Sequence, residues 1–83
     1  MKILFQGDSI TDSGRGRNIT IPNRDLGCGY VNLVAAHATC DNPEIEVYNR
    51  GVSGNRIADA FARWIEDTLN LEFDVFSALF GIN

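Results

Sequence analysis

Apolar and polar positions divide the 83-residue chain into three expected strands and the segments between them. Residues 2–6 form a short apolar run that stops at Gly7, which is typical of a buried strand that ends at a turn. Residues 45–49 alternate apolar and polar side chains, and residues 74–80 form a second, mostly apolar run. Both patterns predict further strands.

Two segments with apolar residues three or four positions apart are expected to be helices. In residues 30–38 these positions are Val31, Val34, Ala35 and Ala38. Residues 56–69 carry a longer stripe, with Asn55 as the expected cap: Ile57, Ala60, Phe61, Trp64 and Thr68. Residues 11–29 are rich in Gly, Asn, Arg and Asp, so we expect mostly an exposed loop there.

The order strand, helix, strand, helix, strand predicts an α/β fold, in which right-handed crossovers join parallel strands and helices cover the sheet. Ligands bind beyond the carboxyl ends of the strands in such sheets. The turns that leave those ends contain Ser9, Gly51 and Asn83, so we expect the site at this rim. The third strand would remain an open sheet edge. We therefore expect the chain to be the amino-terminal part of a larger domain.

Composition narrows the class of protein. Hydrophobic residues make up 45% of the chain and charged residues 22%, which are ordinary proportions for a folded domain. The net charge is -4 and the Lys and Arg are scattered, so we expect no nucleic-acid partner. No apolar run reaches the length of a bilayer span and no signal-peptide core precedes Gly7, so we expect no membrane partner and a cytoplasmic location. Cys28 and Cys40 are expected to be reduced thiols.

Three short motifs follow the three expected strands: Gly-Asp-Ser-Ile-Thr-Asp at 7–12, Asn-Arg-Gly-Val-Ser-Gly-Asn at 49–55 and Gly-Ile-Asn at 81–83. In this order and spacing they resemble the first three sequence blocks of the GDSL/SGNH hydrolases. Residues 29–31 and 62–67 resemble the acetylxylan-esterase-like branch of that family. The resemblance covers nearly the whole chain. It implies the three-layer, flavodoxin-like SGNH hydrolase fold, of which residues 1–83 would form the amino-terminal β-α-β-α-β part.

The resemblance also implies roles for individual residues. Ser9 would be the nucleophile of an esterase, and its N–H, the Gly51 N–H and the Asn83 side-chain amide would form the oxyanion hole. Asp8 would help to order the nucleophile turn. These residue types suit the chemistry, because glycine lets the main chain approach a developing oxyanion and an amide donates without changing its protonation. The implied substrate is a small ester, such as an acetyl group on a carbohydrate, and no metal or organic cofactor is implied.

A serine nucleophile needs a general base. The one histidine of the sequence, His37, lies late in the first expected helix, which runs about 15 Å away from the level of Ser9. We therefore do not expect His37 to be the base. In the family, the Asp and His of the triad occupy a carboxy-terminal D-x-x-H block that these 83 residues do not contain. We expect the isolated chain to be almost inactive.

Other interpretations stay open. The glycine-rich strand ends could bind an anion or a phosphate ester, although the Gly-x-x-x-x-Gly-Lys motif is absent. The chain could also be a non-catalytic interaction domain that pairs its open sheet edge, for example in a homo-oligomer. Ser9 alone could be a capping serine. The aromatic residues are more simply core or interface residues than a ligand-stacking set: Phe61, Trp64, Phe73, Phe76 and Phe80.

Overall fold

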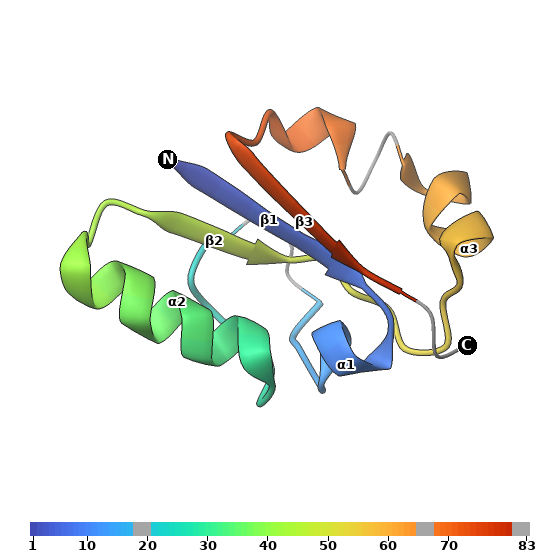
Figure 1. The fold of residues 1–83 in the computed structure, drawn as a ribbon, viewed down its shortest axis with the longest axis horizontal. Helices are drawn as coiled ribbons and strands as arrows, with labels where there is room; N and C mark the ends of the chain where they lie inside the picture. The colour runs from blue at the N-terminus through green and yellow to red at the C-terminus, as the bar shows by residue number, and fades with distance from the viewer. Residues whose placement is uncertain (18–20, 65–67, 81–83) are drawn as a thin grey trace.

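The computed structural model describes residues 1–17, 21–64 and 68–80, and within them three strands form one parallel sheet. The strands are β1 (Lys2–Gly7), β2 (Glu46–Asn49) and β3 (Val75–Leu79). Their order in the sheet is β2-β1-β3, so the strand that carries the first motif lies in the middle (Figure 1). The predicted parallel α/β sheet is confirmed.

One face of the sheet is covered by α2 (Tyr30–Asp41). The core on this side combines Phe5 and Val47 from the strands with Val31 and Ala35 from the helix. The Phe5 and Tyr30 rings meet edge to face, with their centroids 5.7 Å apart. The helix extends three residues beyond its expected end at Ala38, and Pro43 follows shortly after its last residue. Proline cannot donate to a continuing helical ladder.

The opposite face carries α3 (Ile57–Ala62) and the 3-10 helix η1 (Leu69–Leu71). Gln6 is fully buried on this side and its Nε2 donates to Thr68 Oγ1 at 3.1 Å. The Trp64 and Phe76 rings also meet edge to face here, 5.4 Å apart. In Figure 1, α1 (Ser9–Asp12) and α2 lie on one side of the sheet and α3 on the other. The expected three-layer arrangement is confirmed.

The second predicted helix, over residues 56–69, is interrupted at Arg63. Its first part, α3, ends at Ala62, where the Arg63 N–H bonds to the carbonyl oxygen of Ala60 at 3.3 Å, three residues back instead of four. Trp64 is helical again, and its carbonyl oxygen accepts from the Thr68 N–H at 3.0 Å. Residues 65–67 lie outside the described part of the chain. The prediction of Asn55 as the cap is wrong. Arg56 is the N-cap residue, and Asn55 Oδ1 instead accepts a hydrogen bond from Arg63 Nε at 2.8 Å.

Part of the apolar stripe is exposed, which differs from the expected packing. The side chain of Ile57 is 71% exposed and that of Phe61 is 77% exposed, whereas Trp64 packs on Phe76. The Phe73 ring joins this aromatic pair, 5.3 Å from Phe76. Together with neighbouring residues the stripe lines an open apolar hollow: Ile57, Ala60, Phe61, Trp64, Ala78 and Phe80.

The expected exposed loop at 11–29 is partly wrong. The segment begins within the short helix α1 and includes several buried residues: Thr11, Asp12, Arg15 and Leu26. Asp12 and Arg15 bond to the turn after β2, and the Thr11 and Leu26 carbonyl oxygens accept from Asn49 at the end of β2, which is why a polar segment can be buried. Those partners are far away in the sequence, so composition alone did not indicate them.

Three general properties complete the description. Cys28 and Cys40 are free, exposed thiols, as expected. Among the helices of the described ranges, none is long and apolar enough to cross a membrane. The same residues contain no group of three or more His, Cys, Asp or Glu side chains that could hold a metal ion.

Candidate active site

Ser9 is exposed at the first position of α1, directly after the central strand. Asp8 precedes it as the N-cap residue, and its carboxylate accepts a hydrogen bond from the Ile10 N–H at 3.1 Å. The Asp12 N–H closes the turn on the Asp8 carbonyl oxygen at 2.8 Å. Because the Asp8 side chain is buried and bonded, the turn presents the Ser9 hydroxyl to solvent from a fixed main chain.

The turns after β1 and β2 lie side by side at one rim of the sheet. The Val52 N–H donates to the Gly7 carbonyl oxygen at 3.0 Å. Gly7 also lies level with Leu79, near the end of β3. A side chain at position 7 would place its Cβ 2.6 Å from the Leu79 carbonyl oxygen, so the close approach of the strands requires glycine there.

Gly51 is buried where the β2 turn meets α1. A Cβ at this position would lie 2.7 Å from the Asp12 main-chain nitrogen. The Gly51 carbonyl oxygen accepts from Arg15 Nε at 2.7 Å, and its N–H donates to Asn49 Oδ1 at 3.0 Å. This N–H could bind an acyl oxygen only after releasing Asn49. The expected role of Gly51 as an oxyanion donor stays a prediction, and it requires that the Gly51 N–H give up its hydrogen bond to Asn49.

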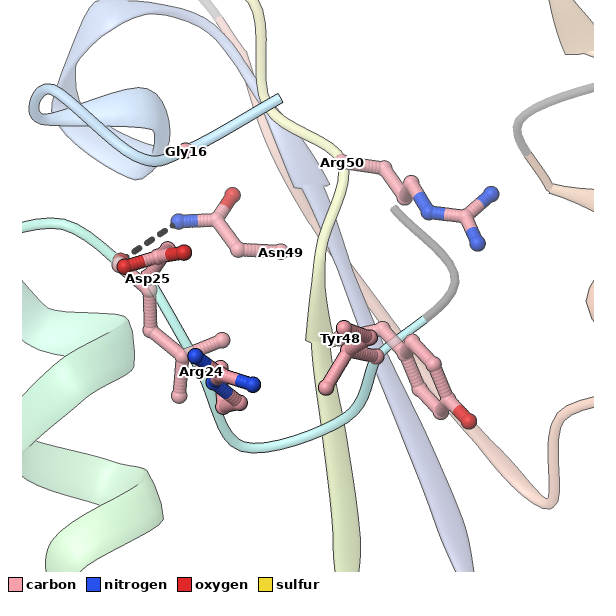
Figure 2. A pocket seen from close by; sticks show the side chains of 8 residues that line it. Gly16, Arg24, Asp25, Tyr48, Asn49 and Arg50 are labelled. Atoms are coloured by element: carbon pink, nitrogen blue, oxygen red, sulfur yellow. Dashed lines mark hydrogen bonds between the residues drawn. The ribbon is translucent and has the colours of Figure 1, made fainter. Parts of the chain in front are cut away.

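Asn49 ties the end of β2 to the segment that follows Ser9. Its Nδ2 donates to the carbonyl oxygens of Thr11 at 2.7 Å and of Leu26 at 2.9 Å. Figure 2 shows the Asn49 side chain pointing toward the loop at Asp25, while Arg50 points to the other side of β2. The two N–H groups and the oxygen of this buried amide are therefore all engaged within the protein.

A small hollow lies beside this part of β2 (Figure 2). Eight residues line it: Gly16, Ile21, Arg24, Asp25, Leu26, Tyr48, Asn49 and Arg50. The Arg50 guanidinium stacks over the Tyr48 ring, 5.8 Å from its centroid. Burial raises the pKa of the Tyr48 hydroxyl, and its hydrogen bond to Glu46 acts in the same direction, so this phenol stays protonated at neutral pH.

Asp12 joins the two turns through its side chain. Its carboxylate is 1% exposed and accepts from the Ser53 N–H at 2.9 Å, the Ser53 hydroxyl at 3.2 Å and Arg17 Nη2 at 3.0 Å. The Arg15 N–H donates to its second oxygen at 3.2 Å. Burial alone would raise the pKa of this carboxyl, but the Arg17 and Ser53 donors outweigh burial and lower the pKa below its ordinary value.

Two other residues considered at the sequence level are placed differently. Asn83 lies outside the described residues. His37 is exposed on α2, about 10 Å along the helix axis from Tyr30. The end of α2 at Tyr30 lies against α1, because the Tyr30 hydroxyl lies 2.7 Å from Thr11 Oγ1. This placement agrees with the expectation that His37 is not the base for Ser9.

The sequence indicated Ser9 but gave no role to Asp12 or Asn49. Asparagine is unfavourable in a strand, so its position directly before the turn at the end of β2 was a usable signal. Asp12 lies three residues after Ser9 and five before Arg17, which was a weaker signal. Neither pattern indicates which distant residue is the hydrogen-bond partner.

Comparison with known proteins identifies relatives over almost the whole chain. No protein-family model matches it. An acetylxylan esterase from Geobacillus stearothermophilus is 44% identical over 89 residues, which covers 99% of this chain and 39% of the esterase. A crystal structure of a GDSL-like lipase from Parabacteroides merdae superposes with a TM-score of 0.93 at 42% identity, over 98% of this chain and 39% of the lipase. This chain therefore spans about two fifths of the length of these relatives.

The crystal structure of the Geobacillus esterase superposes with a TM-score of 0.90 at 45% identity, over 99% of this chain and 39% of the esterase. Catalytic mutants of that esterase replace a serine, an aspartate and a histidine, and the last two stand three positions apart. Identity of 42–45%, with a shared arrangement of strands and helices, shows that this chain is homologous to the amino-terminal part of an acetylxylan esterase and of a GDSL-like lipase.

Proposed function

We propose that this chain supplies the nucleophile and the oxyanion-binding groups of a serine esterase that removes acetyl groups from carbohydrates. The observation that carries the proposal is the exposed Ser9 side chain at the end of the central strand, on a turn fixed by the buried Asp8 cap. The acetylxylan esterase relative supports the substrate class. A hydroxyl in this position can reach an ester carbonyl without any movement of the sheet.

In the proposed reaction, Ser9 Oγ attacks the carbonyl carbon and its proton passes to a general base. The tetrahedral oxyanion accepts hydrogen bonds from the Ser9 N–H and from the Asn83 side-chain amide, a role that the family resemblance implies for Asn83. Each such donor contributes about 3–4 kcal/mol to the transition state. The intermediate then expels the alcohol, which takes a proton from the base, and water hydrolyses the acyl-enzyme.

A further main-chain donor is expected from the segment after β2. Gly51 can supply it by exchanging Asn49 Oδ1 for the acyl oxygen. Gly54 offers a second candidate amide in the same segment, because it is exposed on the turn that the Asn55 N–H closes on the Val52 carbonyl oxygen at 3.1 Å. Its φ of 84° suits a tight turn of this kind.

The proposal assigns the base to a D-x-x-H block outside these 83 residues. His37 is exposed on α2, about 10 Å along the helix axis from Tyr30, whose hydroxyl meets Thr11 of α1. The catalytic aspartate and histidine of the Geobacillus esterase have the same spacing as the family block. We therefore expect residues 1–83 alone to be almost inactive. The cytoplasmic location and the expected absence of nucleic-acid and membrane partners stay predictions from the sequence.

The test is a chimaera in which residues 1–83 replace the matching segment of the Geobacillus esterase. Because this segment is 44% identical, the remaining esterase should supply the base and complete the fold. We expect the chimaera to hydrolyse p-nitrophenyl acetate and to release acetate from acetylated xylan. Ser9→Ala should lower turnover by about 10³-fold or more.

The matched control is Ser13→Ala, because Ser13 lies just after α1 and its hydroxyl donates to the Ile10 carbonyl oxygen at 2.7 Å. It should keep most of the activity. A chimaera that folds by circular dichroism but does not turn over would contradict the proposal, as would full activity in the Ser9→Ala variant.

The anion-binding interpretation is less favoured by the geometry. The helix α1 has four residues, so its dipole is small. The Ile10 N–H at its start already donates to the Asp8 carboxylate, whose negative charge repels a phosphate. An ester carbonyl, which is neutral in the ground state, meets no such repulsion.

A further inference from the structure

We propose that Asp12 is a positioning residue, whose carboxylate holds the turn after β2 in register with the Ser9 turn while the ester reacts. The inference rests on the proposed esterase function, because register matters only if both turns act on one acyl group. Asp12 itself touches no substrate in this scheme. It acts through Ser53, whose main chain belongs to the segment that is expected to supply an oxyanion donor.

The first support is that Asp12 belongs to both turns at once. Its main-chain N–H bonds to the Asp8 carbonyl oxygen at 2.8 Å, within the helical turn that also contains Ser9. Its side-chain Oδ2 accepts from Ser53 N–H at 2.9 Å, 41 positions later in the sequence. A single residue therefore links the main chain beside the hydroxyl to the main chain after β2.

The second support is the number of donors that converge on one buried carboxylate. Oδ2 accepts from the Ser53 N–H, the Ser53 hydroxyl and Arg17 Nη2, and Oδ1 accepts from the Arg15 N–H. An ionised carboxylate accepts at both oxygens, whereas an asparagine in the same place has one oxygen and one NH2 group. Either orientation of that amide would direct its NH2 toward an N–H donor, so aspartate is specifically suited to this position.

The third support is the tight packing around the link. Gly51 approaches so closely that a Cβ there would lie 2.7 Å from the Asp12 nitrogen, and the Val52 N–H bonds to Gly7 at 3.0 Å. The β2 turn is thus fixed at its start by the strands and farther on by Asp12. Loss of the Asp12 carboxylate would free the second attachment and leave the first in place.

The experiment measures kcat and KM for Asp12→Asn in the chimaera described above. We expect kcat to fall by about 10²-fold with KM nearly unchanged, since a displacement of about 1 Å at a reacting group costs this much and substrate binding does not use Asp12. Ser53→Ala, which removes one of the contacts and keeps the N–H, should lower kcat by about 3- to 10-fold. Asp41→Asn, an exposed change at the end of α2, is the control and should retain parental kinetics.

The outcomes separate the two proposals. Parental kcat in a folded Asp12→Asn chimaera overturns the role of Asp12 and leaves the esterase function standing. A raised KM with an unchanged kcat, which marks lost substrate binding, overturns it in the same way. If Asp12→Asn does not fold, Ser53→Ala decides, and an unchanged kcat in that variant overturns the inference. A folded parental chimaera without Ser9-dependent activity overturns the proposed function, and the role of Asp12 falls with it.

Discussion

The Gly51 amide donates a 3.0 Å hydrogen bond to the side-chain oxygen of Asn49, two residues earlier on the same strand end. The NH2 group of the same side chain holds the Thr11 and Leu26 carbonyl oxygens. Asn49 is therefore a buried junction between the β2 turn, α1 and the loop that leads to α2. This junction, and the neighbouring link from Asp12 to Ser53, determine how the turn after β2 lies against Ser9.

The junction leads to a prediction for Asn49→Ala. The substitution leaves two buried carbonyl oxygens without their donors, so the free energy of unfolding should fall by about 2–4 kcal/mol. Urea unfolding followed by circular dichroism measures the change. Asn32→Ala, on the exposed side of α2, is the control and should change stability by less than about 0.5 kcal/mol. Equal losses in the two variants would contradict a junction role for Asn49.

The close approach of Gly51 to α1 can be tested with alanine. Gly51→Ala would place a Cβ against the Asp12 nitrogen and the Thr11 side chain, so we expect a loss of about 3 kcal/mol. Gly54→Ala meets no atom within 4 Å but must adopt a positive φ, which costs about 1 kcal/mol. Thermal unfolding of both variants compares the steric contact at Gly51 with the backbone conformation at Gly54. A larger loss for Gly54→Ala would show that the turn conformation matters more than the packing.

The lowered pKa of Asp12 predicts a pH-dependent contribution to stability. A carboxyl whose pKa is lower in the folded state stabilises the fold above its unfolded pKa of about 3.9, and this contribution is lost as the pH falls through the folded pKa. The stability difference between the parent and Asp12→Asn should therefore be larger near about pH 6 than near about pH 2.5. Urea titrations of both proteins at several pH values measure it. A difference that does not change with pH would contradict an ionised Asp12.

The buried pair on the other face of the sheet gives a fourth prediction. Thr68→Val removes the acceptor for Gln6 Nε2 and leaves a buried amide unpaired, at a cost of about 1–3 kcal/mol. Adding Gln6→Leu should recover much of this loss, because two apolar groups then replace both partners. Thr39→Val on α2 is the control, since the Thr39 hydroxyl bonds only to its own helix, at the Ala35 carbonyl oxygen. Additive losses in the double variant would argue against the Gln6–Thr68 bond.

Local sequence patterns were sufficient to predict the strands and helices that are stabilised mainly by their own apolar residues. The central strand follows from its continuous apolar run, because its last four residues are all buried, and α2 follows from its apolar periodicity, because its buried Val31 and Ala35 stand one helical turn apart. The break in the second predicted helix was not foreseen, since the apolar stripe continues past Ala62 while Arg63 turns back to bond Asn55 and the Arg50 carbonyl oxygen. Such tertiary bonds override periodicity and leave no trace in it.

The candidate site was predictable only in part, for a similar reason. The end of a central strand is a general location for ligands, so Ser9 could be singled out from sequence order and the motif that contains it. The bond from Asn49 to Thr11 spans 38 positions and the bond from Asp12 to Ser53 spans 41. No local window contains both partners, which is why the support around Ser9 became visible only in the fold.

The central place of β1 has a consequence for how the protein is made. Ile3 pairs with Val47 on one side and with Val75 on the other, so β1, which is synthesised before β2 and β3, has a neighbour that is synthesised 72 positions later. At about 5–20 residues per second, β1 waits roughly 4–14 s for this second partner. During that interval the edge of β1 that later pairs with β3 is unprotected against other nascent chains.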